Sequence, residues 1–186
     1  MRQLDASHKE SIKGNLAHWC YEVDSEFQQA NDAAVLDAAK YMDVKTVYEL
    51  GCGDGASLKG FWELGFKTFG IDINTDKLNA VEYGTTYKMD MVSWLQFAKV
   101  GSLPNIFMHH SLEHIVKVDK LLELVSKKLS KGGIFYCVVP ADDTPNTVHF
   151  TAFDNAEELL PPGLKPIVVT KQERFGHPEF KCVATK

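Results

Sequence analysis

The length, composition and charge of the chain limit the kinds of protein that it can be. Its 186 residues are enough for one well-filled core and few for two domains. The balance of 45% hydrophobic to 24% charged residues excludes a disordered or fibrous chain. A formal net charge of −5 repels polyanions, so we expect no nucleic acid partner. We expect a single domain over residues 1–186.

The first residues and the cysteines indicate a cytoplasmic protein. Residues 1–10 are polar and mixed in charge, so we expect neither a signal peptide nor a membrane anchor. The four cysteines are far apart and form no C-x-x-C pair, which disfavours a zinc knuckle and a dithiol redox site. We expect no membrane partner, and thiols that are reduced and mostly buried.

Hydrophobic periodicity predicts helices and strands that alternate over most of the chain. A helical spacing over 24–42 is followed by an apolar, β-branched run over 46–50 that stops at Gly51. Further helices are expected at 56–64, 76–83, 93–99 and 116–129, and further strands at 67–73, 85–89, 106–109 and 134–139. This alternation is typical of a parallel sheet with helices on both faces.

The end of the chain departs from this alternation. Two strand patterns, at 166–170 and 180–185, follow a short piece over 155–160 with no helix between them. Neighbouring strands joined without a crossover helix must be antiparallel. The predicted fold class is α/β, a three-layer sandwich whose seven-stranded sheet is mostly parallel with the last strand antiparallel. We expect residues 46–186 to form this core and residues 1–45 a helical lid segment.

The most informative segment is 47–55, V-Y-E-L-G-C-G-D-G, in which a buried strand runs into three alternating glycines and then a helix. Glycines at such a turn let backbone N–H groups and a helix N-terminus approach a ligand closely. Asp72 ends the next strand, where a carboxylate can accept hydrogen bonds from ribose hydroxyls, and Asp90 follows the third strand. Because ligands of open α/β sheets bind at the carboxyl ends of the strands, this set predicts a nucleoside-like ligand.

Two kinds of cofactor are compatible with the glycine turn. Gly51, Gly53 and Ala56 spell G-x-G-x-x-A, the dinucleotide fingerprint of nicotinamide-dependent oxidoreductases. Glu49, two residues before the first glycine, brings no advantage to a phosphate site but suits a cationic sulfonium ligand with an ammonium group. A tight turn with capping aspartates is the alternative without a ligand. The ordered set of glycines and two acids favours a ligand-binding site over such a turn without a ligand.

With these residues the sequence closely resembles the class I S-adenosylmethionine-dependent methyltransferases. Their E/D-x-G-x-G-x-G motif is matched position for position by Glu49, Gly51, Gly53 and Gly55. The likeness spans about 47–186, includes the S-L-E-H-I string of 111–115 known from the small-molecule branch, and departs at Asn105, where the family usually has Asp. It implies a Rossmann-like fold that binds S-adenosylmethionine and releases S-adenosylhomocysteine. The cofactor-binding residues that it implies are Glu49, Gly51, Cys52, Gly53, Asp72, Ile73, Asp90, Met91 and His109.

Histidines are the candidates for acting on the methyl acceptor. Methyl transfer from a sulfonium is an in-line displacement in which the protein orients, excludes water and sometimes supplies a base. His149, in the long segment 140–153, and His114 are the candidate catalytic residues, with a structural histidine as the competing interpretation of each. His110, Glu113 and His114 also spell H-x-x-E-H. We expect no metal, because His110 lies at a strand exit rather than on a long helix.

The acceptor is expected to be a small molecule. Enzymes that methylate nucleobase amines have N/D-P-P-Y/F after the fourth strand, where this chain has M-H-H-S at 108–111. The sequence therefore predicts methyl transfer to an O or N atom of a small-molecule acceptor. The alternatives are an NAD(P)-dependent oxidoreductase on a similar sheet, and a non-catalytic protein that binds S-adenosylmethionine.

Overall fold

A seven-stranded sheet in the order β4-β3-β2-β5-β6-β9-β8 forms the centre of the computed structural model, which describes residues 1–3, 25–79, 81–141 and 149–186. Its strands are β2 (Thr46–Leu50), β3 (Lys67–Asp72), β4 (Thr85–Lys88), β5 (Leu103–His109), β6 (Leu129–Pro140), β8 (Lys165–Arg174) and β9 (His177–Thr185). The helices are α2 (Ser25–Ala39), α3 (Ala56–Glu63), α4 (Thr75–Leu78), α5 (Met91–Phe97) and α6 (Val118–Lys128), with short 3-10 helices η1 (Leu112–His114) and η2 (Ala156–Leu159). Of the predicted helical lid segment, 1–45, residues 4–24 lie outside the described residues.

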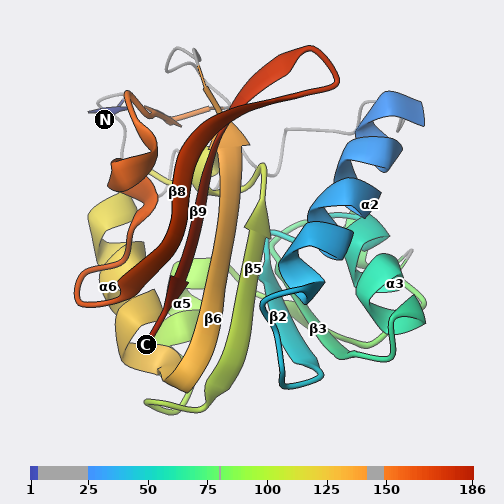
Figure 1. Ribbon diagram of the computed structural model, residues 1–186. Helices are drawn as coiled ribbons and strands as arrows, with labels where there is room; N and C mark the ends of the chain where they lie inside the picture. Colours follow the sequence, from blue (N-terminus) through green and yellow to red (C-terminus); the bar gives the residue numbers. More distant parts are fainter. Residues whose placement is uncertain (4–24, 80, 142–148) are drawn as a thin grey trace.

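The sheet has the predicted mixture of strand directions. Strands β2 to β6 run parallel to one another, whereas β9 is antiparallel to both β6 and β8. The reversal takes place in the β8–β9 hairpin, where Phe175 and Gly176 have φ of 49° and 77°. Figure 1 shows α2 and α3 on one face of the sheet and α5 and α6 on the other. The predicted three-layer α/β fold with an antiparallel last strand is therefore confirmed.

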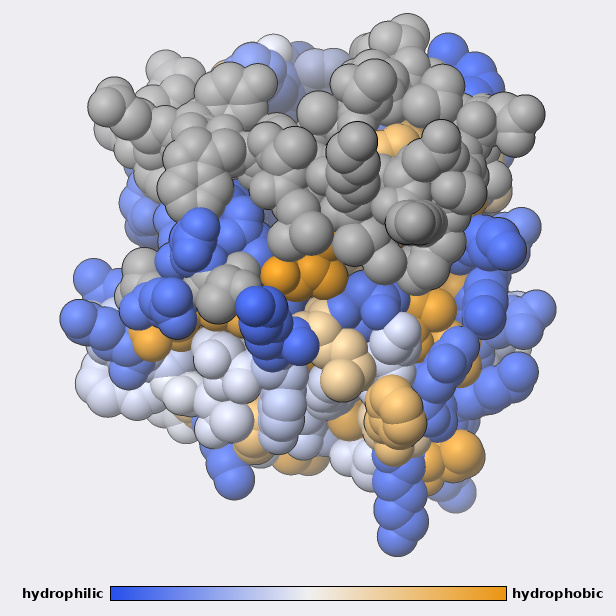
Figure 2. Space-filling view, turned by 180° about the vertical axis from the view of Figure 1, so that it is seen from behind, coloured by the Kyte–Doolittle hydropathy of each residue, from blue (hydrophilic) through white to orange (hydrophobic). Residues whose placement is uncertain are grey.

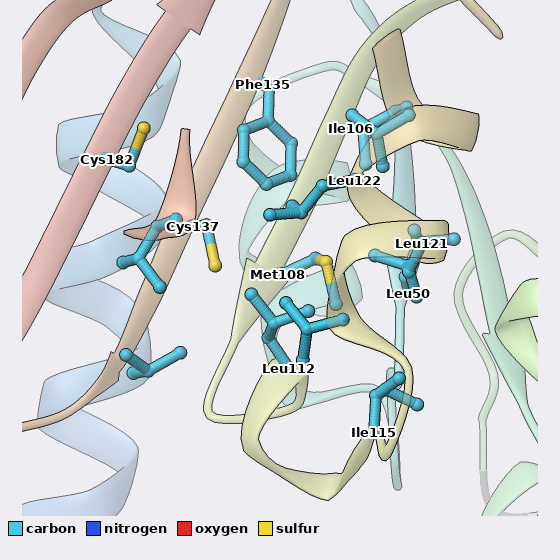
Figure 3. Packing of buried hydrophobic residues seen from close by; sticks show 14 of the residues in the cluster. Leu50, Ile106, Met108, Leu112, Ile115, Leu121, Leu122, Phe135, Cys137 and Cys182 are labelled. Carbon is cyan, nitrogen blue, oxygen red and sulfur yellow. The ribbon is translucent and has the colours of Figure 1, made fainter. Parts of the chain in front are cut away.

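The core lies in two layers, one on each face of the sheet. Along β6, side chains alternate between the layers: Tyr136 belongs to the cluster under α2 and Cys137 to the larger cluster under α6. Figure 3 shows Leu121 and Leu122 of α6 against the central strands in that larger cluster. Burying a side chain of this size stabilises the fold by about 1.5–3 kcal/mol. These layers hold the carboxyl ends of the strands in place.

Several element boundaries differ from the prediction, including those between α6 and β6 and at the end of α4. Helix α6 ends at Lys128 and β6 begins at once, before the glycines that were expected to separate them. The reason is that the N–H of Gly132 donates to the carbonyl of Lys186, and the N–H of Lys186 donates to Gly133, so the glycines continue the strand pairing. The helix predicted over 76–83 is a single turn, α4, that ends at Leu78.

A second, two-stranded sheet was not predicted. Strand β1 (Arg2–Gln3) pairs antiparallel with β7 (Thr151–Ala152), which places the start of the chain beside the segment that follows His149. On the face opposite to that of Figure 1, most of the surface that is coloured by hydropathy is hydrophilic, and the apolar residues form separate small groups (Figure 2). Among the described residues, none of the helices has the length and apolar character to cross a bilayer.

Candidate cofactor and acceptor site

The glycine turn begins where β2 ends, and glycine is needed at its positions for different structural reasons. Gly51, Gly53 and Gly55 have φ of 81°, 54° and 84°, a region that residues with a Cβ rarely adopt. Among the described residues, a Cβ at Gly53 would approach only Lys77, 3.9 Å from its Cδ. A Cβ at Gly51 would lie 2.5 Å from Cβ of Ser111. Gly51 is therefore needed for packing against Ser111, and, among the described residues, Gly53 faces the open side of the turn.

Asp72 lies beside this turn, at the carboxyl end of β3. Its Oδ2 accepts a hydrogen bond from the N–H of Gly53 at 2.9 Å, and its Oδ1 accepts one from the N–H of Asn74 at 2.8 Å. Each carboxylate oxygen has a further lone pair, so the group can still accept hydrogen bonds from two neighbouring hydroxyls. The structure thus places the predicted ribose-binding acid against the glycine turn.

Glu49 is buried at the end of β2, with 3% of its surface exposed. Its Oε2 has no hydrogen-bond partner among the described residues. Burial raises the pKa of Glu49 well above its usual value; a hydrogen bond from Ser57 opposes this shift, and the Asp72 and Asp54 carboxylates add to it. A cation would compensate this concentration of negative charge, whereas a phosphate would be repelled. The site therefore fits a sulfonium nucleoside with an ammonium group better than a pyrophosphate.

Asp90 and Met91 lie at the same edge of the sheet. Asp90 caps α5, because its Oδ1 accepts a hydrogen bond from the N–H of Ser93 at 3.0 Å. The Cε of Met91 would lie 3.3 Å from a Cβ at Gly51, so this side chain reaches the turn. Ile73 follows β3 and is half-buried.

Cys52 contributes to the core rather than to an open surface. It is buried beside β3, and its Sγ would lie 2.7 Å from a Cβ at Gly70. Burial raises the pKa of its thiol, so the group stays protonated. Cys52, Cys137 and Cys182 are buried and free, which confirms the expectation for three of the four cysteines, and Cys20 lies outside the described residues.

His109 ends β5 and faces α2, where a polar residue interrupts the apolar helix face. Its Nδ1 lies 2.7 Å from Oδ1 of Asn31, which also accepts a hydrogen bond from Oγ of Ser57 at 3.3 Å. Burial lowers the pKa of His109 and favours the neutral ring. Through Ser57, these contacts connect His109 with Glu49. Sequence reasoning missed Asn31, whose only signal was an amide on an otherwise small and apolar helix face.

His110 leaves the strand with a φ of 49°, a strained conformation for this residue type. Its Nε2 lies 2.9 Å from Oε1 of Glu179, whose other oxygen contacts Gln172 at 3.0 Å and Arg174 at 3.4 Å. Burial lowers the pKa of His110, but the hydrogen bond to Glu179 and the charges of Glu113 and Glu179 outweigh burial, so the pKa is raised. His110 thus lies at a strand exit, as expected, and Glu179 is a partner that no spacing indicated.

The structure brings His114 and His149 together, although 35 positions separate them. Their ring centroids are 4.9 Å apart, with an interplanar angle of 73°. The 3-10 helix that carries His114 is anchored in the apolar cluster, where Figure 3 shows Leu112 and Ile115. Oγ1 of Thr151 donates to the carbonyl of Ile115 at 2.6 Å, which fixes the segment after His149 against this helix.

The chain matches the methyltransferase domain family over residues 23–164. It is 23% identical over 162 residues to a ubiquinone biosynthesis O-methyltransferase of Paraburkholderia xenovorans, covering 80% of this chain and 70% of that protein. A methyltransferase dependent on S-adenosylmethionine from Archaeoglobus fulgidus has a TM-score of 0.73 and 18% identity, over 86% of this chain and 94% of that one. The 1,6-didemethyltoxoflavin-N1-methyltransferase of Burkholderia thailandensis, with bound S-adenosylhomocysteine, has a TM-score of 0.71 and 16% identity, over 100% and 93% of the two chains.

The family match covers most of the chain and confirms the enzyme class predicted from the glycine turn. The NAD(P)-dependent alternative finds no support in these similarities. The chain therefore belongs to the methyltransferase domain family and uses S-adenosylmethionine as methyl donor.

Proposed function

We propose that the protein transfers the methyl group of S-adenosylmethionine to an O or N atom of a small-molecule acceptor in the cytoplasm. The observation that carries the proposal is the buried Glu49 carboxyl group, whose Oε2 finds no hydrogen-bond partner in the part of the chain that the structure describes. An ammonium group is the complement to such a site. The similarity to an O-methyltransferase and an N-methyltransferase supports a small acceptor.

We assign the cofactor to the edge formed by the ends of β2, β3 and β5. The backbone of Gly51, Cys52 and Gly53 would surround its amino-acid part, with Glu49 on the ammonium group. Asp72 would accept hydrogen bonds from the ribose, and His109 would lie near the amino-acid end. Ile73, Asp90 and Met91 would border the adenine. When bound, S-adenosylmethionine supplies an electrophilic methyl group on a positively charged sulfur.

We place the acceptor beside His114 and His149. The segment that carries His114 starts at Ser111, whose Oγ donates to the carbonyl of Leu50 at 2.7 Å, directly before the glycine turn. This contact supports an acceptor position beside the histidine pair, because it holds the segment that carries His114 against the residue before the glycine turn. The pair would activate the O–H or N–H of the acceptor, and the formal charge of −5 argues against a polyanionic one.

Calorimetry with S-adenosylmethionine, S-adenosylhomocysteine and NAD tests the cofactor assignment. We expect the first two to bind and NAD not to bind, and the reverse result would overturn the proposal. A panel of small hydroxyl and amine compounds, assayed for S-adenosylhomocysteine release, then tests turnover. His149→Ala should slow turnover and keep cofactor affinity. Cofactor binding without methyl transfer to any acceptor would favour the non-catalytic alternative.

A further inference from the structure

The acceptor-side histidines have a buried carboxylate as neighbour. Glu113, His114 and His149 each offer one ligand atom, and the three atoms lie within 4.8 Å of one another. Glu113 is 2% exposed, and within the described residues its Oε2 has no hydrogen-bond partner. A buried carboxylate oxygen without a hydrogen-bond partner destabilises the fold unless a cation compensates its charge. We propose that Glu113, His114 and His149 bind a divalent transition-metal cation that holds the acceptor, an inference that rests on the proposed function.

The donor set agrees with this class of ion. Two imidazoles and one carboxylate suit zinc, iron or cobalt, and catalytic zinc sites use three protein ligands with a position left for substrate. Metal–ligand bonds of about 2.0–2.2 Å require the three atoms to approach further. The side chains of His114 and His149 are half-buried, whereas Glu113 and the preceding Leu112 are buried in the fold.

A neighbouring group shows why the site belongs to these residues. His109, His110 and Glu179 also lie within 4.8 Å of one another. The carboxylate of Glu179, however, is already bonded to His110 and Gln172, and Arg174 lies 3.4 Å away. A guanidinium at this distance repels a metal cation. The expectation of no metal rested on His110 at the strand exit, and the site proposed here uses His149 in its place.

A cation at this position narrows the proposed acceptors from compounds that accept the methyl group on O or N to hydroxyl compounds. Glu113 follows Ser111 by two residues, and Ser111 packs against Gly51, so the ion would lie near the cofactor turn. A cation that binds the acceptor oxygen lowers the pKa of its hydroxyl group, whose proton passes to water. The oxygen lone pair then forms the new C–O bond to the methyl carbon. The electron pair of the broken C–S bond stays on sulfur and leaves neutral S-adenosylhomocysteine.

Titration of the full-length, chelator-treated chain with Zn²⁺ and Co²⁺ tests the site without any turnover. We expect one equivalent to bind by calorimetry, and Co²⁺ to develop visible d–d absorption. Glu113→Gln and His149→Ala should each weaken binding by at least about 10-fold. His177→Ala, which removes an exposed histidine of β9, is the matched control and should bind as the wild type does. Equal binding by all four proteins would overturn the site.

Two further measurements distinguish a failure of the metal site from a failure of the proposed function and from a misfolded variant. S-adenosylhomocysteine affinity is measured on the same samples: if the wild type binds it but no metal, the metal site is wrong and the proposed function stands. If the wild type does not bind it, the proposed function fails. Imidazole ¹⁵N NMR of the wild type during Zn²⁺ addition covers the case of a misfolded variant. Unshifted resonances of His114 and His149 would reject the site by themselves.

Discussion

The carboxylate of Asp72 holds the backbone of the glycine turn, because its Oδ2 accepts a hydrogen bond from the N–H of Gly53 at 2.9 Å. The two residues belong to different strand ends, β3 and the turn after β2. The acid proposed to bind the ribose therefore also fixes the turn proposed to surround the amino-acid part. Changes at either residue are expected to affect both.

Replacing Asp72 with Ala should weaken S-adenosylhomocysteine binding by about 1.5–3 kcal/mol, the range for hydrogen bonds to a charged group. It should also lower the free energy of unfolding, because the N–H groups of Gly53 and Asn74 lose their acceptor. Calorimetry and urea unfolding measure the two effects. Asp43→Ala, which changes an exposed acid in the loop before β2, should change neither. Unchanged affinity in Asp72→Ala would remove this residue from the cofactor site.

Alanine at Gly53 should reduce cofactor affinity more than stability. Its φ of 54° costs an alanine about 1–2 kcal/mol, and the added Cβ meets no atom of the described residues closer than 3.9 Å. Gly101→Ala, just before β5, is the matched control, with a φ of 68° and no atom of the described residues within 4 Å of its added Cβ. Gly51→Ala should unfold more easily than both, because its Cβ would lie 2.5 Å from Ser111. Urea unfolding ranks the stabilities of the three variants. Full affinity of Gly53→Ala for S-adenosylhomocysteine would contradict the proposal that Gly53 faces the cofactor on the open side of the turn.

The elements near the cofactor turn could be predicted because their signals are local. Strand β2 has the predicted bounds Thr46–Leu50, since an apolar run ends at a glycine. Parallel strand ends share one edge of a sheet, so Glu49 and Asp72 could be placed together from their positions along the strands.

Other features depend on contacts that no spacing reveals. Strands β1 and β7 have two residues each and pair across almost the whole chain. Glu179 reaches His110 from the last hairpin, and Asn31 reaches His109 from α2. The departure at Asn105 has a structural reason, because its Nδ2 donates to the carbonyls of Val44 and Thr46 at 2.7 and 2.8 Å. An ionised aspartate has no proton to donate to them.

The affinity for S-adenosylhomocysteine should rise with pH as Glu49 ionises. Burial raises the pKa of this group above its value of about 4.3 in an unfolded chain. The folded protein thus prefers the neutral form, and its contribution to stability is full below the unfolded pKa and is lost as pH rises through the folded pKa. The free protein should lose stability over the range in which the ionised group gains affinity for the ligand's ammonium.

Calorimetry and urea unfolding across this pH range measure the slopes of affinity and of stability against pH. Glu49→Gln should flatten them, whereas Glu123→Gln, at an exposed position on α6, should leave them as in the wild type. A pH-independent affinity in the wild type would show that Glu49 does not pair with the ammonium group.

Acid should weaken the contact between α2 and the sheet at Asp37. Burial favours a higher pKa for Asp37, but hydrogen bonds from Lys181 at 2.8 Å and Tyr136 at 3.0 Å prevail and lower it. A lowered pKa means that this stabilisation is present above the unfolded pKa of about 3.9 and is lost as pH falls through the folded value. Asp37→Asn should therefore cost about 1.5–3 kcal/mol at neutral pH and progressively less in acid. Urea unfolding against pH measures the difference, with Asp32→Asn, exposed on the same helix, as control. A difference that stays constant into acid would show that the charge of Asp37 contributes nothing, and that its hydrogen bonds alone hold α2 to β6 and β9.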